Sequence, residues 1–212
     1  MQKWIILSLI GGLFCLTSQG QEWKKPVDSL PPHKWEFDAT ANLIFLKNDF
    51  IFLPIATADR GQLHLEGRYN YEDINTTSLW TGVNFHFGEI NTLDLTPMAG
   101  VVFGNSNGVA PGMRLTFAHK RFELYSEGEY FISLDDVSLN FFYFWTDLSY
   151  SPSDWFSFGI SGQRTHMYHN SVDIQHGIFS TFNYKKANLT GYWYNIGQGS
   201  SSFVILSLGY TF

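Results

Sequence analysis

The sequence predicts an all-β fold, an up-and-down antiparallel β-barrel that crosses a membrane. First, runs of about ten residues alternate apolar and polar side chains, the period of a strand that lies between two different environments. Second, the connections between these runs are short and long in turn, as in a transmembrane barrel. Third, 18% of the residues are aromatic and only 15% are charged, yet the mean hydropathy is close to zero. A barrel reconciles these values, because only every second residue of a strand faces lipid.

The composition also argues against several other classes of protein. Twenty Phe, eleven Tyr and seven Trp are too many for a disordered chain. The chain has 13 Lys and Arg against 19 Asp and Glu, a net charge of −6, which is the opposite of a basic nucleic-acid footprint. A single Cys excludes a disulfide framework. We therefore expect no nucleic-acid partner and no dependence on disulfides.

Residues 1–20 are expected to be a signal peptide. A basic start at Lys3 is followed by an apolar run over residues 4–16, which is shorter than the ~20 residues that a transmembrane helix needs. Ser18 and Gly20 are small residues at the positions that favour cleavage before Gln21. The alternative, a retained membrane anchor, is disfavoured by the length of the run. The segment therefore predicts that the chain is exported, and its removal would leave a mature chain without cysteine.

Residues 21–34 contain three prolines and no regular period, which predicts an irregular N-terminal segment before a barrel over residues 35–212. The clearest alternating run places Leu63 and Leu65 on one face, opposite His64 and Glu66. The predicted strands, in order, are residues 35–46, 50–57, 61–72, 79–87, 93–103, 113–117, 122–132, 142–150, 156–163, 174–184, 189–193 and 204–212.

The number of strands depends on residues 35–60. Ten strands run from residue 61 to the end, and an even total keeps both termini on the same side. Residues 35–46 and 50–57 then either form two further strands or lie outside the barrel. Pro54 weakens the second run as a strand, because proline donates no ladder hydrogen bond. We favour twelve strands, with ten as the alternative.

The apolar faces are expected to point to lipid rather than into a soluble core. Nearly every run carries Phe, Leu, Tyr or Trp on its apolar face, more volume than the interior of one small barrel could accept. Rings near the strand ends fit the two aromatic girdles of a membrane barrel. These rings are Tyr69, Tyr71, Tyr150, Tyr184, Trp193 and Tyr210.

The end of the chain carries a resemblance to a known group. Leu208, Tyr210 and Phe212 occupy alternate positions in the last run. This pattern resembles the C-terminal insertion signal of bacterial outer-membrane β-barrels, and the architectural likeness covers roughly residues 35–212. It implies a Gram-negative outer-membrane location, contact with outer-membrane lipid and recognition of the last strand by the barrel-assembly machinery. It implies no activity, and we expect a monomer with residues 21–34 in the periplasm.

The polar faces are expected to line an acidic lumen. The residues that we single out are His64, Glu66, Arg68, His86, Arg114, Glu123, Glu127 and Glu129. One interpretation is that Arg68 and Arg114 pair with these carboxylates, since unpaired buried charges are costly. That interpretation gives the barrel a structural or surface role and no assigned biochemical activity. The alternative is a narrow channel for small solutes that favours cations.

Enzyme and metal sites are the weakest possibilities. His169 and Ser171, with Asp173, form the only close cluster of potential catalytic residues, and they vaguely resemble the His-x-Ser pair of lipid A deacylases. The residues that follow this pair in that family are absent, so a polar loop is the better interpretation. His166 and His169 have no zinc-site spacing. We predict no catalytic residue, no metal and no cofactor, and a lipid-modifying enzyme remains the minor alternative.

Overall fold

The computed structural model describes residues 34–164 and 174–212, which lie almost entirely in strands. The strands are β1 Glu36–Phe45, β2 Phe50–Arg60, β3 Leu63–Tyr69, β4 Thr76–Val83, β5 Phe85–Phe87, β6 Asn91–Gly104, β7 Gly108–His119, β8 Phe122–Ser133, β9 Phe141–Ser153, β10 Phe156–Arg164, β11 Gln175–Tyr184, β12 Ala187–Tyr194 and β13 Phe203–Thr211. Two short 3-10 turns, Val137–Leu139 and Gly199–Ser201, lie between strands. None of the helical segments in the described part of the chain has the length and apolar character to span a membrane.

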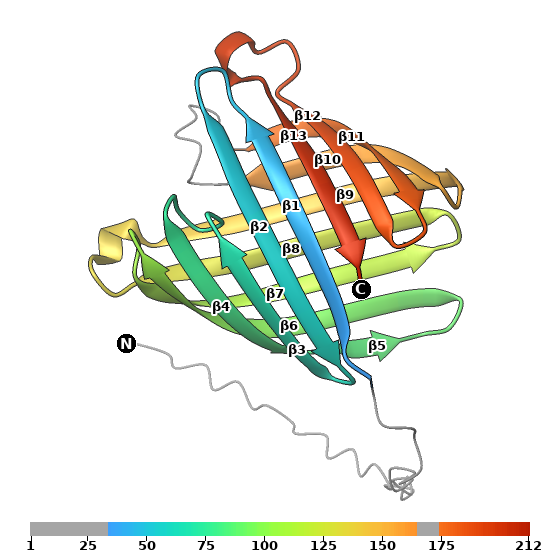
Figure 1. Cartoon of the computed structure of the whole chain (residues 1–212), viewed down its shortest axis with the longest axis horizontal. Coiled ribbons are helices and arrows are strands. Elements are labelled where there is room, and N and C mark those ends of the chain that lie inside the picture. Colours follow the sequence, from blue (N-terminus) through green and yellow to red (C-terminus); the bar gives the residue numbers. More distant parts are fainter. Residues whose placement is uncertain (1–33, 165–173) are drawn as a thin grey trace, which may run out of the picture. The chain divides into compact units, whose positions relative to one another are not determined.

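The strands form one closed antiparallel sheet. The first strand, β1, pairs with β2 on one side and with the last strand, β13, on the other (Figure 1). The ring closes where β4 pairs with β6. The short segment β5 continues β4, because both pair with β6 in one register. The described residues thus make a barrel of twelve strands, which confirms the favoured prediction. Residues 35–60 contribute two of these strands, β1 and β2, to the wall of the barrel.

Prolines explain where the ladder is interrupted. Pro97 of β6 lies where the register would place a partner for Val83, at the break between β4 and β5. Pro111 of β7 lies in the gap of the β7–β8 ladder. Proline has no backbone N–H to donate, so each of these positions loses a hydrogen bond. Pro54 does not end its strand, and β2 continues through it opposite Ala41.

The two ends of the barrel differ in their connections, as predicted. At the tight-turn end the connections are residues 61–62, 88–90, 120–121, 154–155 and 185–186. At the long-loop end the described connections are residues 46–49, 70–75, 105–107, 134–140 and 195–202. Lys120 and Lys185 have positive φ, which suits the two-residue turns that follow the twist of a hairpin. The backbone N–H of Phe212 donates to the carbonyl of Phe37 at 2.9 Å, so β1 begins and β13 ends at the tight-turn end.

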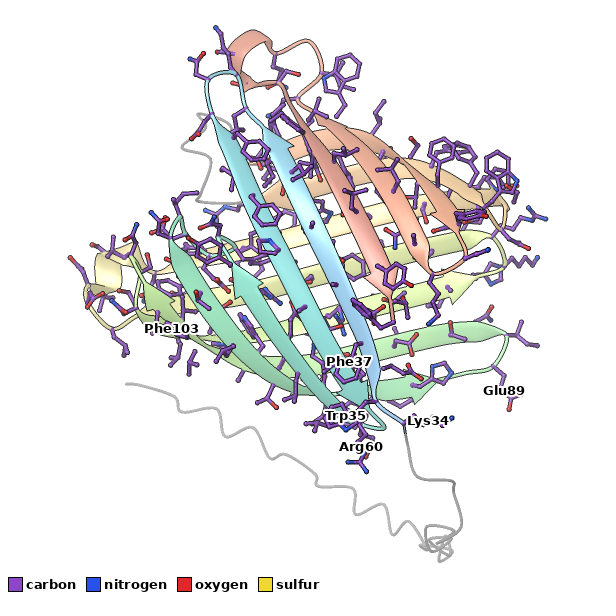
Figure 2. All side chains as sticks on the ribbon, in the orientation of Figure 1. Lys34, Trp35, Phe37, Arg60, Glu89 and Phe103 are labelled. Atoms are coloured by element: carbon purple, nitrogen blue, oxygen red, sulfur yellow. The ribbon has the colours of Figure 1, made fainter. Side chains whose placement is uncertain are left out.

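The outer face of the barrel is apolar, as predicted. Large hydrophobic side chains at alternate positions are exposed on strand after strand, for example Leu79, Val101 and Ile178. The labelled rings of Phe37 and Phe103 belong to this set (Figure 2). An exposed apolar surface of this extent is unfavourable in water. It is favourable in the hydrocarbon of a membrane, where a closed barrel also satisfies all of its backbone hydrogen bonds internally. The fold is that of a barrel built to lie in lipid.

One ring predicted for the aromatic girdle turns inward instead. Tyr71 is only 7% exposed, so its placement on the lipid face was wrong. The strand β3 ends at Tyr69, and Asn70 has a φ of 56°, which breaks the alternation of faces. Tyr69, Trp193 and Tyr210 remain exposed on the outer face.

Candidate functional site

The polar residues singled out from the sequence lie on one side of the barrel. Strand β3 carries His64, Glu66 and Arg68, β5 carries His86, β7 carries Arg114, and β8 carries Glu123, Glu127 and Glu129. The structure brings six of them into one network of buried or half-buried side chains and leaves out His86 and Glu123. The side chain of His86 is 61% exposed and pairs with Asp94 at 2.6 Å. Glu123 lines the same cavity as Glu66, Arg114 and Glu127 but forms no ion pair with the network among the described residues.

Arg68 is the centre of this network. Its guanidinium contacts Glu66 at 2.6 Å, Glu127 at 2.8 Å and Glu129 at 3.0 Å, and its side chain is fully buried. The rings of Tyr71 and Trp80 cover it, with centroids 4.2 and 4.5 Å from the guanidinium carbon. A buried charge requires close partners, and here the carboxylates and the ring faces supply them.

A second part of the network surrounds Glu66. His64 Nε2 lies 3.1 Å from its carboxylate, and Arg114 Nη1 lies 3.8 Å away. The other ring nitrogen of His64, Nδ1, lies 2.8 Å from Asp59. The side chain of Arg114 is one quarter exposed, so this arginine reaches the lumen while Arg68 does not.

The connection 70–75 adds a further buried carboxyl group. Glu72 is 2% exposed, and burial raises the pKa of this carboxyl above its ordinary value, an effect that the charge of Arg68 partly offsets. The left-handed residues Asn70 and Asn75 fold this connection back on itself, and the Asn70 side chain accepts the backbone N–H of Asn75. Glu72 therefore joins Glu66, Glu127 and Glu129 near a single fully buried arginine.

Toward the long-loop end the interior contains a cluster of apolar side chains, beside buried polar side chains such as those of Gln163 and Gln175. The cluster, which we call the apolar layer, comprises Ile44, Ile51, Leu53, Tyr71, Tyr143, Tyr194, Phe203 and Ile205. All of these residues are less than 9% exposed. Tyr71 connects the layer to the charged network, because its ring packs edge-on against Tyr143 and its hydroxyl donates to Glu127 at 2.8 Å. Of the residues in the layer, only Tyr71 lines the hollow part of the interior toward the tight-turn end.

Toward the tight-turn end the interior is hollow. An outer cavity of about 830 Å³ and an inner chamber of about 650 Å³ share Asp59, Arg114 and Tyr125 in their walls. The carboxylates that line the inner chamber are Asp38, Asp59, Glu66, Glu123, Glu127 and Asp147. Arg114 is the one Lys or Arg among the described residues of that wall. The chamber is therefore acidic, even though Glu66 and Glu127 also pair with Arg68 behind the wall.

Aromatic side chains hold two of these carboxylates in place. Asp147 accepts hydrogen bonds from the Trp145 indole at 2.8 Å and from the Tyr192 hydroxyl at 2.9 Å, and it also accepts from Ser161. Glu127 likewise accepts from Tyr71 at 2.8 Å and from Tyr125 at 2.6 Å.

Sequence reasoning did not name Tyr125, Trp145 or Tyr192 as site residues, although strand alternation contains the signal, and it placed Tyr71 on the lipid face. Tyr125 lies two residues from both Glu123 and Glu127, and Trp145 lies two residues from Asp147, so each shares the inner face of its strand. Tyr71 lies beyond the end of its strand, and no alternation could have placed it.

Other predicted features lie on the outer face or outside the described residues. Leu208, Tyr210 and Phe212 are exposed on or just beyond β13. The signal peptide with its cleavage point, most of the segment 21–34, and the His169–Ser171–Asp173 cluster with His166 fall outside the described residues. No group of three or more His, Cys, Asp or Glu within residues 34–164 and 174–212 could hold a metal ion.

Comparisons with known proteins identify the fold. The sequence matches no protein-family model and no curated protein. Among solved structures, the chain is similar to the KdgM porin, with a TM-score of 0.60 and 12% identity over 84% of this chain and 99% of that one. The KdgM porin in complex with disordered oligogalacturonate gives a TM-score of 0.58 and 11% identity over the same shares. At this level of identity the likeness concerns the fold alone, a β-barrel of the kind seen in these outer-membrane porins.

Proposed function

We propose that this protein is an integral outer-membrane barrel that serves as a narrow channel for small cationic solutes, and that the described conformation is a closed one. The observation that carries the proposal is the wall of the inner chamber, which holds six carboxylates and one arginine. Two of the six, Glu66 and Glu127, also pair with Arg68, and the other four leave an excess of negative charge in the wall. Acidic linings favour cations in channels, because they lower the electrostatic barrier to entry.

The location in an outer membrane is supported by three features of the chain. The outer face is apolar, the fold is that of porins, and the last strand carries alternate apolar side chains that end at Phe212. We propose that a signal peptide over residues 1–20 directs export with cleavage before Gln21, and that the barrel-assembly machinery reads the last strand. The tight-turn end then faces the periplasm, and the barrel is a monomer without cofactor or catalytic role.

The charge of the chamber argues against carrying over the ligand that one structural neighbour holds. The neighbour is described in complex with oligogalacturonate, whose sugars carry carboxylates. An acidic wall repels such a polyanion and attracts cations. We therefore assign His64, Glu66, Arg68, His86, Arg114, Glu123, Glu127 and Glu129 to the charged lining and its supporting network, and we do not carry the neighbour's ligand over.

The closed state follows from the apolar layer and from Arg68. Tyr71 is the residue of the layer that lines the chamber, and it contacts Glu127, Arg68 and Tyr143. A conducting state requires these side chains, or the connection 70–75 that carries Tyr71, to move aside.

The experiment is a planar-bilayer recording of the wild type, Tyr71→Ala and Tyr69→Ala. Tyr69 is the matched control, because it is a tyrosine two residues away that is 38% exposed on the outer face. We expect rare or small openings in the wild type and in Tyr69→Ala, and larger and more frequent openings in Tyr71→Ala. Absence of openings in all three, with the barrel folded by its heat-dependent mobility on a gel, would contradict the channel.

A second candidate function is a sealed barrel with a structural or surface role. The packing of the apolar layer and the multiple ion pairs of Arg68 favour it. This candidate predicts that Tyr71→Ala stays silent in the same recording, so the experiment separates the two.

A further inference from the structure

We propose that the inner chamber contains a binding site for an organic cation, a solute with an ammonium or guanidinium group on a small apolar body. The charged group would lie against Asp147, Trp145 and Tyr192. This inference names the substrate class of the proposed channel and rests on that function for its biological meaning, but the binding itself needs no conduction.

The barrel already contains one organic cation in such surroundings. The guanidinium of Arg68 lies between the rings of Tyr71 and Trp80 and contacts three carboxylates. The side chain is fully buried, which is tolerated because ion pairs and cation–π contacts replace its water. The lumen can thus hold a guanidinium group with carboxylates at its edge and rings on its faces.

The wall formed by β9 and β12 provides the same chemistry. Trp145 and Tyr192 meet edge to face with centroids 5.2 Å apart, and both donate hydrogen bonds to Asp147. Phe179 packs against Tyr192 at 5.1 Å and extends the aromatic wall. These hydrogen bonds fix the rings beside the carboxylate, so the wall is ordered before a ligand arrives, which lowers the entropic cost of binding.

Within residues 34–164 and 174–212, no cationic side chain occupies this wall. Among the described residues, no Lys, Arg or His lies within ion-pair distance of Asp147. Arg114, the arginine in the chamber wall, lies 3.8 Å from Glu66 and 3.4 Å from His64 instead. The oxygen Oδ2 of Asp147 accepts from Tyr192 and has capacity for a second donor.

The size and lining of the chamber favour an organic cation over a metal ion. Its volume of about 650 Å³ lies within the range of small-molecule sites, roughly 300–1,000 Å³. Metal ions seek several oxygen ligands at short range, whereas aromatic faces beside carboxylates are the surroundings that bind ammonium and guanidinium groups.

The test uses three probes of matched size and different charge: benzylammonium, benzyl alcohol and benzoate. Each is titrated into the full mature chain folded in detergent, with tryptophan fluorescence and calorimetry as readouts. We expect benzylammonium to bind at least roughly tenfold more tightly than benzyl alcohol, and benzoate to show no saturable binding. Equal affinities for the three probes would overturn the proposal without any variant.

Two variants locate the site. Asp147→Asn keeps the size of the side chain but removes its charge, and we expect it to abolish the preference for benzylammonium over benzyl alcohol. Asp154→Asn is the matched control, because Asp154 is exposed in the tight turn between β9 and β10. An unchanged preference in folded Asp147→Asn would contradict this site. If Asp147→Asn does not fold, protection of the wild-type Trp145 from chemical oxidation by benzylammonium, but not by benzyl alcohol, decides the question, and equal protection contradicts the site.

The outcomes also separate this inference from the proposed function. Selective binding in a barrel that never conducts would support the site and contradict the channel. A cation-selective channel with no preference among the probes would support the function and contradict the site.

Discussion

The guanidinium carbon of Arg68 lies 4.2 Å from the centroid of the Tyr71 ring, and the two side chains share Glu127 as a partner. Arg68 comes from a barrel strand, whereas Tyr71 comes from the connection that follows it. This pair therefore joins the charged network of the barrel wall to the apolar layer at the long-loop end. Its position makes it the structural boundary between the hollow and the packed parts of the lumen.

Removal of Arg68 is expected to destabilise the barrel strongly. Arg68→Met leaves Glu66, Glu127 and Glu129 buried without their common cation, which costs about 3–5 kcal/mol when a buried ion pair is broken. Urea unfolding in lipid vesicles, followed by tryptophan fluorescence, measures the loss. The control is Arg60→Ala, since Arg60 also lies over a ring, that of Trp35 at 5.7 Å, but is exposed (Figure 2). An equal loss of unfolding free energy in both variants would contradict a stabilising role for the Arg68 network.

Gly100→Ala is expected to displace Trp80. A Cβ atom at Gly100 would lie 2.5 Å from the Trp80 ring, and Gly112 faces the same ring from β7. Overpacking of this kind costs about 1–3 kcal/mol, and here it also moves a ring that covers Arg68. Gly162→Ala is the control, because no atom lies within 4 Å of its added Cβ. The urea midpoint of Gly100→Ala should fall well below that of Gly162→Ala, and equal midpoints would refute the close approach.

Glu72→Gln is expected to stabilise the barrel near neutral pH. Burial raises the pKa of Glu72 above its ordinary value of 4.5. The Glu72 carboxyl therefore contributes fully to the free energy of unfolding of the wild type below pH 4.5. This contribution is lost as the pH rises through the folded-state pKa of Glu72. The glutamine variant should have the higher urea midpoint near neutral pH, and the advantage should vanish below pH 4.5. A pH-independent difference, or the same gain in the exposed-turn variant Asp154→Asn, would show that ionisation of Glu72 is not its cause.

The sequence alone was sufficient for the barrel but not for its interior. Alternation along strands such as β3 determines which side chains face lipid, because lipid imposes one rule on every outward position. Inward positions follow no single rule: Glu66 and Ile44 both face inward, yet one joins an ion-pair network and the other the apolar layer. Their surroundings depend on partners far apart in the sequence, such as Arg68 and Glu129, and on the left-handed turn at Asn70, which alternation does not encode.

The most direct test of the account is the reversal potential of Tyr71→Ala in a planar bilayer under a KCl gradient. The carboxylates of the inner chamber predict a potential close to the potassium equilibrium potential, and Asp147→Asn in the same background should reduce it. A potential near zero, or one of the sign that chloride permeation gives, would contradict an acidic, cation-selective lumen.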